Sequence, residues 1–157
     1  MQSILYQQTQ NLLLAIRKSA RSDTKVVLVG YPYMANDDSF VLTTYKMTWL
    51  GIRQVKYEVS KKIRQLGRDL DTLQQNVVNQ VNSDANTDFV TFVNTKDLFR
   101  GHEVDPKMLQ ANPNAWVADF GDGLLLKGEY FHLNAVGHQQ LGTYLCNTFG
   151  SFDAGME

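Results

Sequence analysis

Two short runs of apolar, mostly β-branched residues constrain the fold of this chain more than any other feature. They are Lys25–Gly30 and Phe89–Val93. A short run that is apolar on both faces is typical of a strand buried in a parallel sheet. Apolar residues at helical spacing flank the two runs and predict helices over residues 3–20, about 47–82 and about 135–149. The order helix–strand–helix–strand–loop–helix predicts an α/β fold.

The predicted strands are too few for a complete sheet. Residues 31–46 and 94–131 are predicted to be connections, so the strands hold about a dozen residues, well below the usual share of roughly 20–25%. Two parallel strands alone would leave unpaired backbone groups along both edges. We therefore expect the chain to be part of a larger doubly wound sheet whose N-terminal strands are missing. The alternative is that residues 94–131 hold further strands, for instance near Gly123–Leu126.

Composition predicts a single domain over residues 1–157, because 43% of the residues are hydrophobic and 20% are charged. The net charge of −1 gives no reason to expect nucleic acid or an anionic membrane as a partner. No apolar stretch approaches the roughly 20 residues that span a bilayer, and the first ten residues lack the pattern of a signal peptide. The cellular compartment stays open. Cys146, the single cysteine, lies on an apolar helix pattern and is predicted to be a buried thiol.

A histidine stands just before the last predicted helix, in the run Tyr130–His138. Asn134 is a favourable N-cap residue for that helix, so His132 is expected in the loop that enters it. A histidine held there can act as a general base. His138 follows six residues later inside the helix and is predicted to be structural. This spacing is not that of two zinc-binding histidines on one helix face, and no metal site is expected.

Four segments occur in an order that resembles a known family. They are Val26–Pro32, Phe99–Glu103, Trp116 and Phe131–His138. Together they resemble the C-terminal half of the SGNH (GDSL) esterase and lipase family, over about residues 5–148. The resemblance implies a flavodoxin-like α/β/α sandwich with about five parallel strands, of which this chain would form the C-terminal part.

The resemblance implies that His132 is the general base of a serine ester hydrolase, with no cofactor. It would take the proton of a serine Oγ and return it to the leaving group. Glu129 stands where the family often has the acid of the triad, and Asp119, Asp122 or a backbone carbonyl are the alternatives for orienting the imidazole. Leu133 replaces the proline that usually follows the histidine, a change that a first helical turn tolerates.

The family's nucleophile block, Gly-Asp-Ser, and its oxyanion-hole Gly and Asn have no counterpart here and would lie upstream of Met1. The nearest similar run, Phe120–Gly123, has glycine where the serine would be. Whether this chain is itself an enzyme is therefore uncertain from the sequence.

Three aromatic residues are candidates for substrate binding. Tyr31 and Tyr33 follow the first strand, at the edge where open α/β sheets bind ligands, and Trp116 lies in the loop that leads to the histidine. They are predicted to line a pocket for an ester or acylated small molecule, lipid or glycan, although aromatics in such loops often only fill the core. His102 and Glu103 are predicted to have structural roles.

Three hypotheses follow. The first is the C-terminal segment of an SGNH-type ester hydrolase, inactive without an N-terminal part that carries the serine, which is either supplied by another chain or missing from this sequence. The second is a non-catalytic, truncated relative that acts as a binding or assembly module, its half-sheet pairing with another subunit or with its own copy as a homodimer. The third is a complete small α/β domain unrelated to hydrolases.

Overall fold

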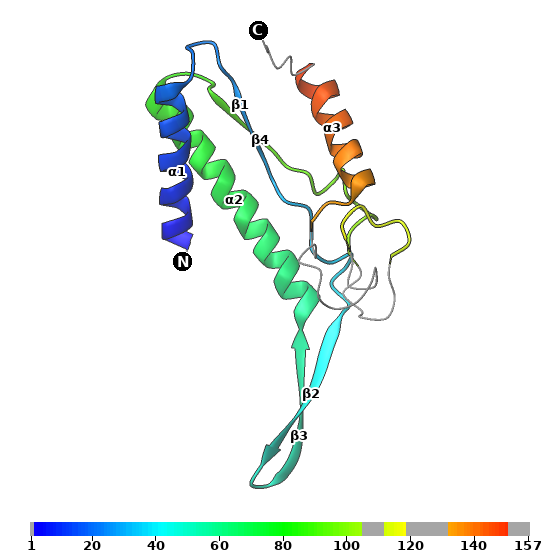
Figure 1. Ribbon diagram of the computed structural model, residues 1–157. Helices are drawn as coiled ribbons and strands as arrows, with labels where there is room; N and C mark the ends of the chain where they lie inside the picture. The colour runs from blue at the N-terminus through cyan, green and yellow to red at the C-terminus, as the bar shows by residue number, and fades with distance from the viewer. Residues whose placement is uncertain (1, 105–111, 119–131, 151–157) are drawn as a thin grey trace.

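The computed structural model describes residues 2–104, 112–118 and 132–150. The elements in chain order are α1 (Gln2–Ser19), β1 (Val26–Val29), β2 (Val41–Thr48), β3 (Gly51–Glu58), α2 (Val59–Ala85), β4 (Val90–Val93) and α3 (Ala135–Phe149). The first and last predicted helices and both predicted strands are confirmed, and the fold is mixed α/β. Figure 1 shows a layered body from which the β2–β3 hairpin extends.

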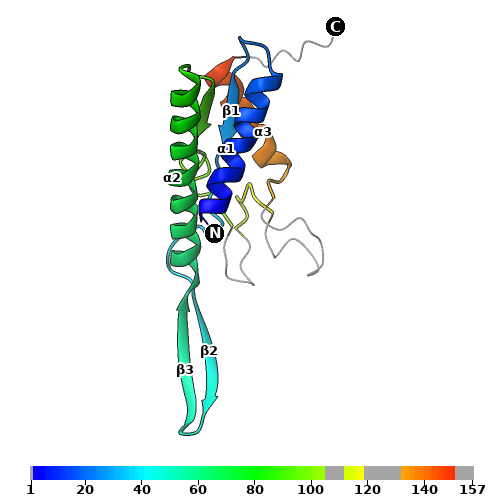
Figure 2. The ribbon, with the colours of Figure 1, turned by 90° about the vertical axis from the view of Figure 1, so that its left-hand side faces the viewer.

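The body is built on a short parallel sheet. β1 pairs with β4 in register from Val26 opposite Val90 to Val29 opposite Val93. Figures 1 and 2 show α1 and α2 on one side of this sheet and α3 on the other. Within the described residues no third strand joins β1 or β4, so each strand has one edge without a strand partner. Gly123–Leu126, where a further strand was considered, lies outside the described residues.

The main core lies between the α1–α2 pair and the sheet. Val77 and Val81 lie one turn apart on α2 and are fully buried, and Leu13 of α1 and Phe89 pack in the same cluster. Asn82 fastens α2 to β4, because its side chain accepts a hydrogen bond from the Val90 N–H and donates one to the Val90 carbonyl. Apolar contacts and two hydrogen bonds therefore both hold β4 against α2.

A second, smaller core lies on the α3 side of the sheet. Phe99, Val104 and Val117 are its buried residues, and Leu133 and Leu141 pack against them. This cluster ties the loop after β4 to the start of α3. The structure therefore holds together segments that the sequence separates by more than thirty residues.

The prediction for residues 31–58 was wrong in two places. Val41–Thr48 is a strand, where a loop was predicted up to residue 46. Gly51–Glu58 is also a strand, so the helix predicted from about residue 47 begins only at Val59. The two strands pair antiparallel over their whole length, with Trp49 and Leu50 as the connecting turn. Threonine, valine and tyrosine dominate β2 and favour a strand there, and Ile52, Val55 and Tyr57 favour one in β3. The turn lacks the usual Asn-Gly or Asp-Gly signal and uses Gly51 at φ +118°.

Two burial predictions were also wrong. Cys146 is exposed on α3, because α3 turns most of its surface away from the body and only Gly137 on it is fully buried. β1 is only partly buried along its length, since a two-stranded sheet covers it on one edge alone. Among the described helices, none is long and apolar enough to cross a membrane.

Candidate functional site

The carboxyl ends of β1 and β4 meet at one end of the body. The Gly30 N–H donates to the Val93 carbonyl at 2.8 Å, and the buried Thr95 hydroxyl donates to the Gly30 carbonyl at 2.9 Å. Figures 1 and 2 show that α3 begins at this same end, and the described residues 94–104 and 112–118 lie there as well. Open α/β sheets bind ligands at the carboxyl ends of their strands, so this end is the candidate site.

A buried ion pair stabilises the candidate site from the side of α2. The Lys96 ammonium lies 2.6 Å from a carboxylate oxygen of Asp71, and the two side chains are 9% and 12% exposed. Lys96 also donates to the carbonyl oxygen of Tyr31 at 3.1 Å. One cation thereby connects the loop after β4, the helix α2 and the loop after β1. A charge buried in this way persists only because its partner and hydrogen bonds are in place.

The two tyrosines predicted to line a pocket have different surroundings. The Tyr33 ring contacts two cations, with the Arg64 guanidinium 3.9 Å and the Lys96 ammonium 5.1 Å from its centroid. Gly67 faces the same ring, and an added Cβ there would lie 3.3 Å from it. Tyr31 is more accessible, and partial burial raises the pKa of its phenol above the usual 10.0. Tyr31 is therefore the better placed of the two to meet a ligand, because Tyr33 is less exposed and is packed against Arg64, Lys96 and Gly67.

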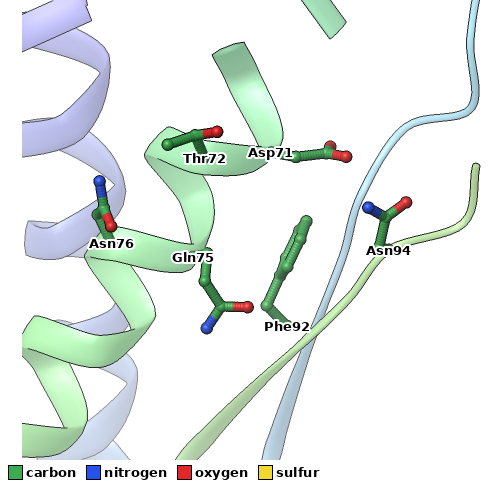
Figure 3. Close-up of a pocket in the computed structure, with 6 residues that line it drawn as sticks. All are labelled: Asp71, Thr72, Gln75, Asn76, Phe92 and Asn94. Atoms are coloured by element: carbon green, nitrogen blue, oxygen red, sulfur yellow. The ribbon is translucent and has the colours of Figure 1, made fainter. Parts of the chain in front are cut away.

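A polar cavity of about 360 Å³ lies between α2 and the end of β4. Figure 3 shows Asp71 and Asn94 extending into the same space from the helix and the strand end, beside the Phe92 ring. The second carboxylate oxygen of Asp71 is buried and has no hydrogen-bond partner within the described residues. His132 is not among the residues that line this cavity.

The histidine loop is fixed through its backbone. The His132 carbonyl accepts a hydrogen bond from the Ala118 N–H at 2.8 Å, and the Asn134 N–H donates to the Trp116 carbonyl at 3.0 Å. Val117 and Leu133 form an antiparallel bridge between these bonds. The side chain of His132 is exposed, and no hydrogen bond to its ring is found within the described part of the chain. Its backbone position is thus set while its imidazole stays accessible.

The start of α3 is specified by two residues. Asn134 caps the helix, since its side chain accepts from the Gly137 N–H at 2.9 Å and donates to the Ala115 carbonyl at 2.7 Å. Gly137 is buried against the Trp116 carbonyl so closely that an added Cβ would collide with that oxygen. The prediction that Asn134 caps this helix is confirmed. A glycine is required at position 137 because a larger residue would clash with the Trp116 backbone.

Trp116 is held by aromatic neighbours. Its ring stacks on His102 with centroids 3.7 Å apart and meets Phe99 edge-on at 5.5 Å. A ring nitrogen of His102 lies 2.7 Å from the Asn114 carbonyl, and the buried Glu103 carboxylate accepts from the Gly101 N–H at 2.6 Å. His102 and Glu103 thus shape the loop beneath the histidine segment. Trp116 is half-buried in this packing, and its contact with substrate stays a prediction.

The orienting acid predicted for His132 falls outside the described residues. Glu129 and its alternatives Asp119 and Asp122 all lie in residues 119–131. Within the described ranges, no group of three or more His, Cys, Asp or Glu side chains is placed to hold a metal ion.

Sequence reasoning missed the pair of Asp71 and Lys96. A signal for Lys96 was present, because a charged residue three positions after a buried strand is expected near the carboxyl edge of the sheet. Asp71 gave no comparable signal, since it lies inside a long helix rich in charged and amide residues. Only the packing of α2 against β4 brings it to Lys96.

Hydrogen bonds and ring contacts thus join residues 99–103, 116–117 and 132–137 beside the exposed imidazole of His132. No protein-family model, curated protein or solved structure matches this chain.

Proposed function

We propose that this chain is the C-terminal segment of an SGNH-type serine ester hydrolase and supplies its general base, His132. One observation carries the proposal. The segments Phe99–Glu103, Trp116–Val117 and His132–Gly137, which underlie the family resemblance, are joined by hydrogen bonds and ring contacts into one unit at the carboxyl end of the parallel strands.

The chemistry assigned to His132 is proton transfer. Its neutral imidazole would accept the proton of a serine Oγ during attack on an ester carbonyl and then protonate the leaving alcohol. Glu129 or a backbone carbonyl would orient the ring, as a third group does in serine hydrolases. Tyr31 and Trp116 would form walls of the acyl or alcohol pocket, and the substrate would be an ester or acylated small molecule, lipid or glycan.

The nucleophile and the oxyanion hole would come from a complementary N-terminal part. The edges of β1 and β4 that have no strand partner within the described residues are where further parallel strands would add. Completing the sheet in this way would produce the flavodoxin-like sandwich and pair the open edge of β1 or β4. The isolated chain is expected to be inactive, because loss of a serine nucleophile removes several orders of magnitude in rate.

The test combines hydrolysis of a p-nitrophenyl ester with labelling by a fluorophosphonate, which reacts with activated serines. The full chain is used as bait in an extract of its source, and the recovered complex is compared with the chain alone. We expect no hydrolysis by the chain alone, and hydrolysis together with labelling of a second polypeptide in the complex. His132→Ala should abolish both, whereas His138→Ala, which changes another exposed histidine six residues away, should leave both in place.

Two results would overturn the proposal. One is hydrolysis that survives His132→Ala. The other is a recovered partner that contains no fluorophosphonate-reactive serine.

A second candidate function is a non-catalytic assembly module, and the open edges of the β1–β4 sheet favour it. Exposed strand edges pair readily with other strands. This reading predicts a stable complex or a homodimer through the sheet, without ester hydrolysis and without any effect of His132→Ala on assembly.

A further inference from the structure

The β2–β3 hairpin stands away from the body. Its strands pair with each other, and Figures 1 and 2 both show the ribbon extending beyond the end where β1 and β4 finish. At its base, Arg64 of α2 donates to the carbonyls of Ala35 and Asn36 and forms an ion pair with Asp38 at 3.2 Å. The root of the hairpin is therefore fastened to α2, while its far end contacts no other described element.

The far end of the hairpin is apolar. Met47 and Ile52 face each other across the last pairs of the ladder and are 90% and 73% exposed. Trp49 and Leu50 form the turn and are 92% and 78% exposed. Large apolar side chains this exposed, gathered at one point, usually mark a surface that binds something. These four residues form the apolar tip of the hairpin.

A basic band lies directly behind the apolar tip. Lys46 and Arg53 are paired directly across the two strands. Lys56 lies three residues further along β3, on the other face of the ribbon. Like charges directly opposite each other destabilise a strand pair. None of the three forms an ion pair within the described residues, and the one acidic residue of the hairpin, Glu58, is 3.5 Å from Lys61. The band is therefore a set of cations without an anion.

The band borders a shallow cavity of about 500 Å³. Its lining includes Lys46, Arg53 and Lys56 together with Thr48 and Gln54. Cationic and hydroxyl or amide donors around one space suit an anionic group such as a phosphate. The chain as a whole carries a net charge of −1, so this positive region is local to the hairpin.

We propose that the hairpin is a membrane-contact element whose apolar tip inserts into the interfacial region of an anionic bilayer while its basic band binds lipid phosphates and carboxylates. The order along the ribbon, apolar first and cationic behind, matches the order of hydrocarbon and charged headgroups at a bilayer surface. Tryptophan prefers this interface, and basic residues next to an anionic leaflet are attracted to it.

The shape of the tip favours a bilayer over a protein partner. Its side chains extend from the turn and from both strands of a narrow ribbon, so a rigid partner would need a deep socket of matching form. Fluid lipid requires no such complementarity, and shallow insertion of an apolar surface with flanking cations is how peripheral proteins attach. A turn of two residues inserts without spanning, since crossing needs about 9–11 residues per strand.

The hairpin lies at the end of the body that holds the candidate site. Attachment through its tip would bring that end toward the lipid surface. The membrane contact does not depend on the proposed hydrolase activity, because lipid binding is measured without any substrate turnover.

The experiment is flotation of the full chain with vesicles of phosphatidylcholine containing about 30% phosphatidylserine, compared with pure phosphatidylcholine. We expect binding to the anionic vesicles that weakens as salt rises from about 0.1 M to about 1 M. Trp49→Ser with Leu50→Ser should abolish binding. Lys46→Gln and Arg53→Gln should each weaken it by about fivefold, the effect of removing one cation near an anionic surface.

Matched controls remove similar side chains elsewhere. Leu66→Ser removes an apolar residue of α2 that is 68% exposed, and Lys18→Gln with Lys62→Gln removes two exposed cations from α1 and α2. These variants should bind anionic vesicles as the unchanged chain does. On vesicles, the tryptophan emission should shift to the blue, and Trp49→Ser should remove that shift while Trp116 remains.

Three results would overturn the proposal. The first is an absence of binding to anionic vesicles by the unchanged chain. The second is binding that the tip variants leave intact, with unchanged circular dichroism. The third is a dimer, detected by light scattering, that Trp49→Ser with Leu50→Ser dissociates, because the tip would then be an interface between two copies.

Discussion

At the scale of single residues, a few side chains fix how distant segments meet. Gly137 lets α3 approach the Trp116 backbone, and Asn134 satisfies polar groups on both sides of that contact. On the α2 side of the sheet, Lys96 connects distant segments through its ion pair with Asp71 and its hydrogen bond to the Tyr31 carbonyl. Each of these residues contacts a segment other than its own helix or loop.

Gly137→Ala should destabilise the protein, because the new methyl group would overlap the Trp116 carbonyl oxygen. Forced overpacking of this kind costs about 1–3 kcal/mol in the free energy of unfolding. Gly142→Ala is the matched control on the same helix, where an added Cβ meets nothing within 4 Å. It should leave stability unchanged or raise it by up to about 1 kcal/mol through helix propensity. Urea denaturation measures both, and equal stability of the two variants would contradict the steric argument.

Lys96→Met should cost about 3–5 kcal/mol in the free energy of unfolding, because it leaves the Asp71 carboxylate buried without a counter-charge. Asp71→Leu should have a similar effect by leaving the ammonium unpaired. The double variant removes both charges and should lose much less than the sum of the two single losses. A double-mutant cycle by chemical denaturation measures this coupling, and strictly additive losses would show that the two groups act independently.

At the scale of elements, local sequence sets where α3 begins, but its position comes from neighbouring loops. The Asn134 cap and the apolar pattern after it define a helix over Ala135–Phe149. The helix buries little of its own surface, and its contact with the body is concentrated at its first turns. The docking of α3 therefore depends on the cap more than on a continuous apolar face.

Asn134→Ala should lower the free energy of unfolding by about 1–2 kcal/mol, the usual effect of losing an N-cap side chain. Asn134→Asp keeps an acceptor for the Gly137 N–H but loses the donor to the Ala115 carbonyl. Its stability should fall between those of the other two proteins. Thermal unfolding measured by circular dichroism orders the three, and an alanine variant as stable as the unchanged chain would refute the role of the cap.

At the scale of the whole molecule, the body and the hairpin differ in how they are stabilised. The body has a core between α1, α2 and the β1–β4 sheet, whereas the hairpin depends on its own ladder and on its fastening to α2. A two-stranded ribbon alone is only marginally stable in water. The two parts should therefore open independently.

Native-state hydrogen exchange should separate them. Backbone amides around Val77, Val81 and Val90 should exchange slowly, near the rate set by global unfolding, because they lie in the main core. Amides of Tyr45 and Gln54 in the hairpin should exchange by local opening, with protection that does not follow global stability when denaturant is added. Equal protection of both groups would show that the hairpin unfolds only with the body.

The sequence by itself determined the elements whose signals are local. The β-branched runs became β1 and β4, and the capped, periodic segment became α3, because strand propensity and a side-chain cap are set by residues close in the sequence. It also showed the histidine at the entrance to α3. It did not show the hairpin, whose strands are joined by a turn without the usual glycine dipeptide.

Only the tertiary structure decided the contacts between segments far apart in the chain. The pairing of Asp71 with Lys96 and the stacking of Trp116 on His102 join residues that no periodicity relates. The exposure of Cys146 and of the apolar tip was likewise decided by what packs nearby, since an apolar side chain is buried only where another element covers it. Local patterns encode the elements, and the arrangement of those elements decides which of their faces remain accessible.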